Sequence, residues 1–64
     1  MDAKYIMQGI VFFRWKELGR FQRKSTAMKN LKQFDLSSSE YNKVRIIENN
    51  SRRIIAERER ESGR

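Results

Sequence analysis

The chain has 64 residues, with fifteen Lys and Arg against eight Asp and Glu (net charge +7), and it contains neither cysteine nor histidine. This composition excludes disulfides, zinc or iron–sulfur sites built from the usual ligands, and catalysis by a histidine base or a cysteine nucleophile. A domain this small has a marginal core, so we expect a homodimer or a partner protein to complete it. The excess positive charge favours acidic partners.

The first predicted element is a helix over about residues 3–33, with a break allowed near residues 19–25. At 100° per residue, one side of this helix is apolar and carries Met7, Ile10, Val11, Leu18 and Phe21. The opposite side carries Lys16, Arg20, Arg23 and Lys24. The pattern is typical of an amphipathic helix with a basic back.

Residues 5–13 are apolar on nearly all sides, which indicates burial on more than one face. Ile10 and Val11 also favour a strand, but the segment does not alternate and no second strand-like run exists to pair with it. A lone strand could pair only with another chain, so helix is the preferred interpretation and an intermolecular strand the alternative. The surplus aromatic and aliphatic side chains predict a partner interface made of Tyr5, Ile6, Phe12, Phe13 and Trp15.

A corner at residues 34–37 is expected to lead into a second helix over about residues 38–60. Ser37 and Glu40 fit a capping box, and Leu36 and Tyr41 fit the hydrophobic staple that accompanies it. A stripe at three- and four-residue steps then follows, formed by Tyr41, Val44, Ile47, Ser51, Ile54 and Ile55. Beyond Ala56 the Glu and Arg residues alternate, so the helix end would bury nothing, and residues 61–64 are expected to fray.

Two DNA-binding motifs remain alternatives at this corner. A helix-turn-helix would use Leu36 in its turn and point Asn42 and Lys43 at the groove, but Leu31 fills the slot for a small side chain. A ribbon-helix-helix would make residues 32–37 a strand, but Asp35 would then face phosphate. The preferred fold is a single all-α domain, a helical hairpin or small three-helix unit.

Basic residues concentrate between Arg14 and Lys32, where seven Lys and Arg accompany one acid, Glu17. We therefore expect a small accessory or regulatory protein that binds nucleic acid, such as a transcription regulator, or acts within a nucleoprotein complex. The predicted binding residues are Lys16, Arg20, Arg23, Lys24, Lys29, Lys32, Asn42 and Lys43. Arg52 and Arg53 would extend this patch if the fold brings them near.

The alternative function is a protein–protein interaction adaptor or inhibitor, whose aromatic helix docks on a partner while the basic face is solvated. Membrane-surface binding is disfavoured, because the same apolar stripe has to form the core. No Gly-rich phosphate loop, carboxylate pair or nucleophile elbow occurs, so we expect no enzymatic activity, metal or cofactor. The apolar run near the N-terminus has no cleavage site after it, and a cytoplasmic location is expected.

Overall fold

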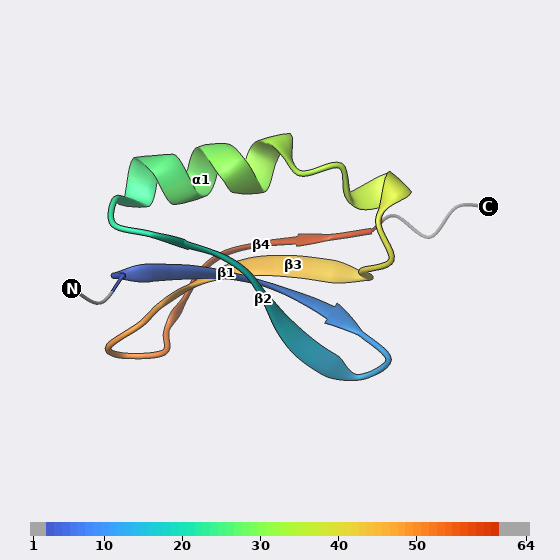
Figure 1. Cartoon of the computed structure of the whole chain (residues 1–64), viewed down its shortest axis with the longest axis horizontal. Helices are drawn as coiled ribbons and strands as arrows, with labels where there is room; N and C mark the ends of the chain where they lie inside the picture. Colours follow the sequence, from blue (N-terminus) through green and yellow to red (C-terminus); the bar gives the residue numbers. More distant parts are fainter. Residues whose placement is uncertain (1–2, 61–64) are drawn as a thin grey trace.

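The computed structural model describes residues 3–60 as a four-stranded antiparallel sheet with one α-helix against it (Figure 1). The elements in chain order are β1 (Tyr5–Val11), β2 (Arg14–Phe21), α1 (Lys24–Gln33), a 3₁₀ turn η1 (Leu36–Ser38), β3 (Lys43–Glu48) and β4 (Ile54–Glu59). The strands lie in the order β2-β1-β3-β4. Two hairpins therefore meet along β1 and β3, and α1 connects them.

The prediction of an all-α helical hairpin or three-helix unit is therefore wrong. Of the helix expected over residues 3–33, only Lys24–Gln33 is helical, and the helix expected over residues 38–60 is absent from the described chain. The frayed end expected at residues 61–64 lies outside the described residues. Pairing between segments far apart in sequence decided the fold, and such pairing overrides local periodicity.

β1 is a central strand with apolar side chains on both of its faces, which explains why residues 5–13 read as apolar all round. Met7 pairs with Gly19 of β2 on one side and with Ile46 of β3 on the other. The side chains of Met7 and Ile6 point to opposite faces of the sheet and both are buried, so the segment shows no simple alternation. The expectation that residues 5–13 have no strand to pair with was wrong. The strand β2 does pair with β1, but its many charged side chains gave no strand-like pattern in the sequence.

β3 and β4 follow the two-residue period of strands, although their isoleucines also fit helical spacing. In β3, Val44 and Ile46 are fully buried under α1, whereas Arg45 points to the opposite face. The doublets Ile46–Ile47 and Ile54–Ile55 each place two apolar side chains side by side in the sequence. One or the other member of each doublet therefore fits both the two-residue period of a strand and the 3.6-residue period of a helix. The register shifts beside the first doublet, where Ile46 pairs with Ala56 but Ile47 pairs with Ile54.

The serine corner is a 3₁₀ turn rather than a helix start. The Ser37 hydroxyl donates to Asp35 (3.0 Å), and the Ser39 hydroxyl donates to the Leu36 carbonyl (2.9 Å) and accepts from the Tyr41 N–H (3.2 Å). These contacts bend the chain toward β3, so the capping box between Ser37 and Glu40 does not form. The helix-turn-helix alternative is wrong because a strand, β3, follows the corner in place of a second helix, and the ribbon-helix-helix alternative is wrong because residues 32–37 hold the end of α1 and the start of η1 in place of a strand.

The core lies between α1 and one face of the sheet. Ala27 and Leu31 of α1 pack against Met7, Val44 and Ile46. Ala27 has no exposed surface, and a side chain this small allows the helix close to the strands.

The backbone of β1 is also approached closely from the serine corner. A Cβ atom on Gly9 would lie 2.7 Å from Cδ1 of the Tyr41 ring, so only glycine leaves room for this contact. Among the described elements, none covers the opposite face of the sheet.

Arg58 of β4 fastens the end of α1 to the sheet. Its Nη1 donates to the carbonyls of Leu31 (2.6 Å), Lys32 (3.2 Å) and Phe34 (2.9 Å). The Leu31 and Phe34 carbonyls also accept backbone N–H groups, from Phe34 (3.4 Å) and Leu36 (3.0 Å), and Arg58 adds a charged donor to this helix C-terminus. The sheet therefore reinforces the C-terminal cap of α1.

Replacing Arg58 with methionine is expected to lower the free energy of unfolding by about 1–3 kcal/mol, because charge-assisted hydrogen bonds are lost while the carbonyls stay partly buried. Urea titration followed by circular dichroism measures this loss. Arg58→Lys is the matched control and should retain part of the stability, since an ammonium also donates several hydrogen bonds. Equal losses in both variants would contradict the capping role.

Candidate nucleic-acid interface

The strand register gathers basic segments at the end of the sheet where β1 begins. Tyr5 pairs with Phe21 at the end of β2 and with Glu48 at the end of β3. The β3–β4 turn joins them, since the Asn49 N–H donates to the Lys4 carbonyl (2.8 Å) and its side-chain amide donates to Ala3 (3.0 Å). Three segments remote in sequence therefore meet at this end.

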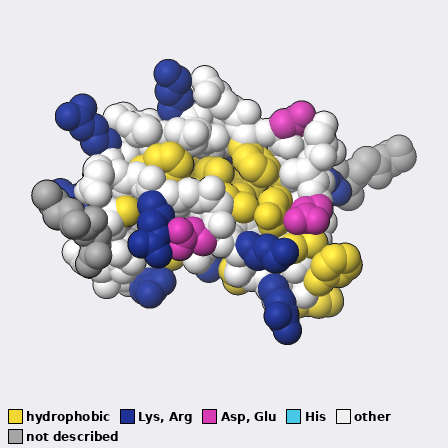
Figure 2. Space-filling model, viewed as in Figure 1, with side chains coloured by type: hydrophobic (Ala, Val, Ile, Leu, Met, Phe, Trp, Pro, Cys, Tyr) yellow, Lys and Arg dark blue, Asp and Glu magenta, His cyan; other side chains and the backbone are white. Residues whose placement is uncertain are grey.

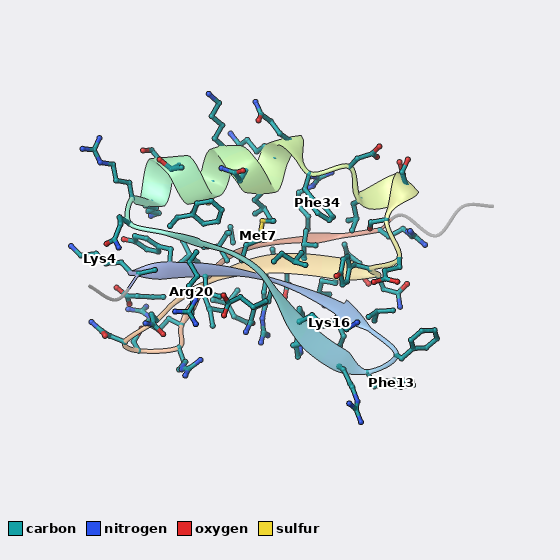
Figure 3. All side chains as sticks on the ribbon, viewed as in Figure 1. Lys4, Met7, Phe13, Lys16, Arg20 and Phe34 are labelled. Carbon is teal, nitrogen blue, oxygen red and sulfur yellow. The ribbon has the colours of Figure 1, made fainter. Side chains whose placement is uncertain are left out.

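We call this cluster the basic end. Its members are Lys4, Arg20, Arg23, Lys24, Arg52 and Arg53. All of these residues are exposed. Figure 3 labels Lys4 and Arg20 at this end of the sheet, and Figure 2 shows dark blue side chains gathered around it. The acids Asp35 and Glu40 belong to the serine corner, beyond the far end of α1.

The β3–β4 turn holds Arg52 in an unfavourable backbone conformation. Its φ is 61°, in the left-handed region that glycine and asparagine adopt most readily. The turn is closed by hydrogen bonds from the Arg52 N–H to the Glu48 carbonyl (2.7 Å) and from the Glu48 N–H to the Arg53 carbonyl (2.8 Å). Folding alone would be served better by glycine at position 52, so the arginine side chain is the feature that needs a functional explanation.

Carboxylates neutralise little of this charge. Glu17 receives two hydrogen bonds from Arg20, at 2.6 and 3.1 Å, and these lower the pKa of Glu17. Glu48 is engaged by the Ser51 hydroxyl, which donates to Oε1 at 2.6 Å. Within residues 3–60 only Arg20 and Lys43 form ion pairs, so the other five members of the basic end have no described carboxylate partner.

The N-terminus of α1 adds to the positive potential of the basic end. Arg23 is the N-cap residue and makes no side-chain capping hydrogen bond, and the first turn contains no acid. The first amides of a helix lack intrahelical acceptors and carry the positive end of the helix dipole. Phosphate oxygens are suitable partners for such amides, and the basic side chains around them favour the same ligand.

The predicted nucleic-acid-binding residues fall into three places. Arg20, Arg23 and Lys24 belong to the basic end, but the prediction that they share one helical face with Lys16 is wrong, because Arg20 and Lys16 lie in β2, Arg23 lies in the loop that follows, and only Lys24 lies in α1. Lys29 and Lys32 are exposed on the outer face of α1, where Ser25, Met28 and Gln33 line a shallow hollow with them. Lys16 is exposed in the half of β2 nearer the β1–β2 turn.

Asn42 and Lys43 serve the sheet instead. The Asn42 N–H donates to the Ile10 carbonyl (2.9 Å), and its carbonyl accepts from the Arg60 N–H (2.8 Å). The Lys43 ammonium lies 3.8 Å from the Glu57 carboxylate. Both residues therefore help to hold β3 in place, away from the basic end.

The residues predicted as one partner interface do not form one surface. Tyr5 and Ile6 point to opposite faces of β1, and Ile6 is buried. Phe12 and Phe13 form the β1–β2 turn. Trp15 lies on the sheet face opposite α1, where the Arg45 guanidinium stacks 3.7 Å from its ring centroid. The assumed helix brought these residues together, and the strand separates them.

A hollow between η1 and β4 is lined by Phe34, Asp35, Leu36, Ser37, Arg58, Glu59 and Arg60. Its arginines are engaged by backbone carbonyls, those of Arg60 belonging to Leu36 (3.2 Å) and Ser39. Hydrogen bonds from Ser38 and Ser37 lower the pKa of Asp35. These contacts hold the corner together. Residues 3–60 bring no three carboxylates together as a metal site would need, and no helix among them is long and apolar enough to cross a membrane.

Sequence reasoning missed Lys4 at the basic end, and it could not place Arg52 and Arg53. The segment Asn49–Asn50–Ser51 between two isoleucine-containing runs was a usable signal, since such residues mark the turn of a hairpin. Comparison of the chain with protein-family models, curated proteins and solved structures found no match. The geometry of this ββαββ domain is therefore the basis for the functional proposal below.

Proposed function

We propose that this protein is a small non-enzymatic nucleic-acid-binding protein that contacts phosphates through its basic end. The observation that supports this most strongly is the gathering of five exposed cations without a described carboxylate partner at the end of the domain where β1 and α1 begin. Clustered Lys and Arg neutralise phosphates and so release the counterions condensed on the nucleic acid, and this release provides most of the affinity in such complexes. The absence of cysteine suits a reducing compartment, so we place this function in the cytoplasm.

Phosphate contacts position a protein without reading sequence, so the expected binding is non-specific. Arg52 and Arg53 extend the basic end on one side, and Arg23 and Lys24 extend it on another. The amides at the start of α1 lie at the same end of the domain as these side chains, so a phosphate backbone has both kinds of donor available there. An accessory or regulatory role on nucleic acid is consistent with such a module.

A salt titration tests the proposal. Fluorescence anisotropy with labelled single-stranded and duplex oligonucleotides, from about 50 to 200 mM salt, should show an affinity that falls steeply. Five phosphate contacts predict a slope of log K against log salt of about −3.5 on single strands and about −4.5 on duplex. Absence of binding at the lowest salt would refute the proposal and leave the protein-binding adaptor as the function to test.

A further inference from the structure

The β1–β2 turn consists of two phenylalanines in the left-handed backbone region. Val11 pairs with Arg14, so Phe12 and Phe13 alone make the turn, and their φ angles are 52° and 64°. Positive φ at both central positions is the requirement of a type I′ hairpin turn, where Asn-Gly is the strongly preferred pair. Two consecutive aromatic residues with a Cβ atom are unfavourable in this conformation.

The two rings do not contribute to the core. Phe12 is 84% exposed and Phe13 is 98% exposed. Figure 3 shows Phe13 at the tip of the hairpin, pointing away from the sheet. Neither the backbone of this turn nor the burial of its side chains explains the phenylalanines, which points to contact with another molecule.

The residues behind the tip are basic and exposed. Arg14 and Lys16 lie opposite Val11 and Gly9, so no carboxylate faces them across the β1–β2 hairpin. Figure 3 labels Lys16 on β2, behind the Phe13 tip, and Arg20 farther along the same strand toward the basic end. The edge strand β2 therefore carries two cations directly behind the aromatic tip, and farther along it Arg20, which is paired with Glu17, leads into the basic end.

This arrangement matches a nucleic-acid strand better than a membrane. β1 spans about 20 Å at roughly 3.3 Å per residue, so the aromatic tip and the basic end lie far apart along the sheet. If the tip entered a bilayer, Arg14 and Lys16 would lie near its surface, but the basic end would lie well beyond the roughly 8 Å over which charges act at physiological salt. A polymer lying along β2 can contact both ends, with its phosphates on the cations and its bases on the rings.

We propose that Phe12 and Phe13 form a stacking site for unpaired bases, so that the protein prefers single-stranded nucleic acid to perfect duplex. The inference rests on the proposed function and specifies its substrate. Aromatic side chains stack on any base, which suits a protein that does not read sequence. Bases within a perfect duplex offer no such face to an exposed ring without being unstacked.

The test is the double variant Phe12→Asn with Phe13→Gly. Because Asn-Gly is the preferred pair for this turn, the variant should fold with unchanged or higher thermal stability, which separates binding from folding. Its affinity for a single-stranded oligonucleotide should fall between about fivefold and a hundredfold, with the same salt slope and unchanged duplex binding. A 2-aminopurine base in the oligonucleotide should show a fluorescence change with the natural protein that the variant lacks.

A second variant distinguishes stacking from general apolar burial. Phe12→Leu with Phe13→Leu keeps apolar side chains but removes the rings, so it should lose single-strand affinity as the Asn-Gly variant does. Unchanged single-strand binding in either variant would overturn the stacking site while leaving the salt-dependent basic end intact. Binding to phosphatidylserine vesicles that is lost in the Asn-Gly variant and kept in the leucine variant would overturn it in favour of a membrane contact. Failure of the natural protein to bind any oligonucleotide would instead refute the proposed function itself.

Discussion

Replacing Arg52 with glycine and Arg53 with glutamine is expected to weaken nucleic-acid binding about 30-fold at low salt. Two charge-assisted contacts of about 1 kcal/mol each account for this loss. The slope of log K against log salt should become shallower by between about 1 and 2, because two fewer counterions are released. Fluorescence anisotropy over the same salt series measures both quantities.

The backbone of the turn makes this variant informative. Arg52 has a φ of 61°, so glycine relieves an unfavourable conformation, and Arg53 contributes backbone groups to the turn that glutamine retains. The melting temperature should therefore stay the same or rise slightly. Any loss of affinity can then be assigned to the missing charges.

The matched control is Lys29→Gln with Lys32→Gln, which removes the same charge from the outer face of α1. If the basic end binds phosphate, this control should lose clearly less affinity than the Arg52 and Arg53 variant. Equal losses would show that net charge rather than its position governs binding. That result would contradict the proposed site.

Ile46→Ala is expected to destabilise the protein by about 2–5 kcal/mol, whereas Ile54→Ala should cost about 1 kcal/mol or less. Ile46 is completely buried between the sheet and α1, and Ile54 is 52% exposed at the sheet edge. A domain of this size rarely has more than about 5 kcal/mol from its core, so the Ile46 variant should be largely unfolded at 37 °C. The same side chain is shortened to alanine in both variants, so the difference between their losses of unfolding free energy reports the difference in burial.

Thermal and urea unfolding followed by far-ultraviolet circular dichroism provides the measurement. The comparison also tests the fold, because helical periodicity assigns Ile54 to the apolar stripe and leaves Ile46 outside it. Greater destabilisation by Ile54→Ala would contradict the sheet. Similar small effects would indicate that α1 does not pack on β3 as described.

Local sequence predicted the part of the fold that local interactions decide. The helix predicted over about residues 3–33 was expected to end where α1 does end, at Gln33. The chain also turns at residues 34–37, where the serines and Asp35 compete for backbone hydrogen bonds. Both features depend on contacts within a few residues, which a pattern can reveal.

The strands could not be predicted in the same way, because their evidence is distributed over the chain. β1 lacks alternation since Ile6 and Met7, on opposite faces, are both buried, and in β2 the partly buried Leu18 and Phe21 stand among charged residues. In β3 and β4 the isoleucine doublets satisfy both a two-residue and a 3.6-residue period. Only pairing across gaps of up to about forty residues decided between them, and that pairing brings each strand the hydrogen bonds it cannot make locally.

The candidate site, like the fold, was predicted in part from the sequence and completed only by the tertiary structure. Composition by itself determined that the protein is a small cation-rich domain without disulfides. The order of the residues placed Arg20, Arg23 and Lys24 within one basic segment. Only the tertiary structure placed Lys4, Arg52 and Arg53 beside them, because the register of β1 with β2 and β3 determines which chain segments share an end. Charge is a property of residues, but a binding surface depends on which strands pair.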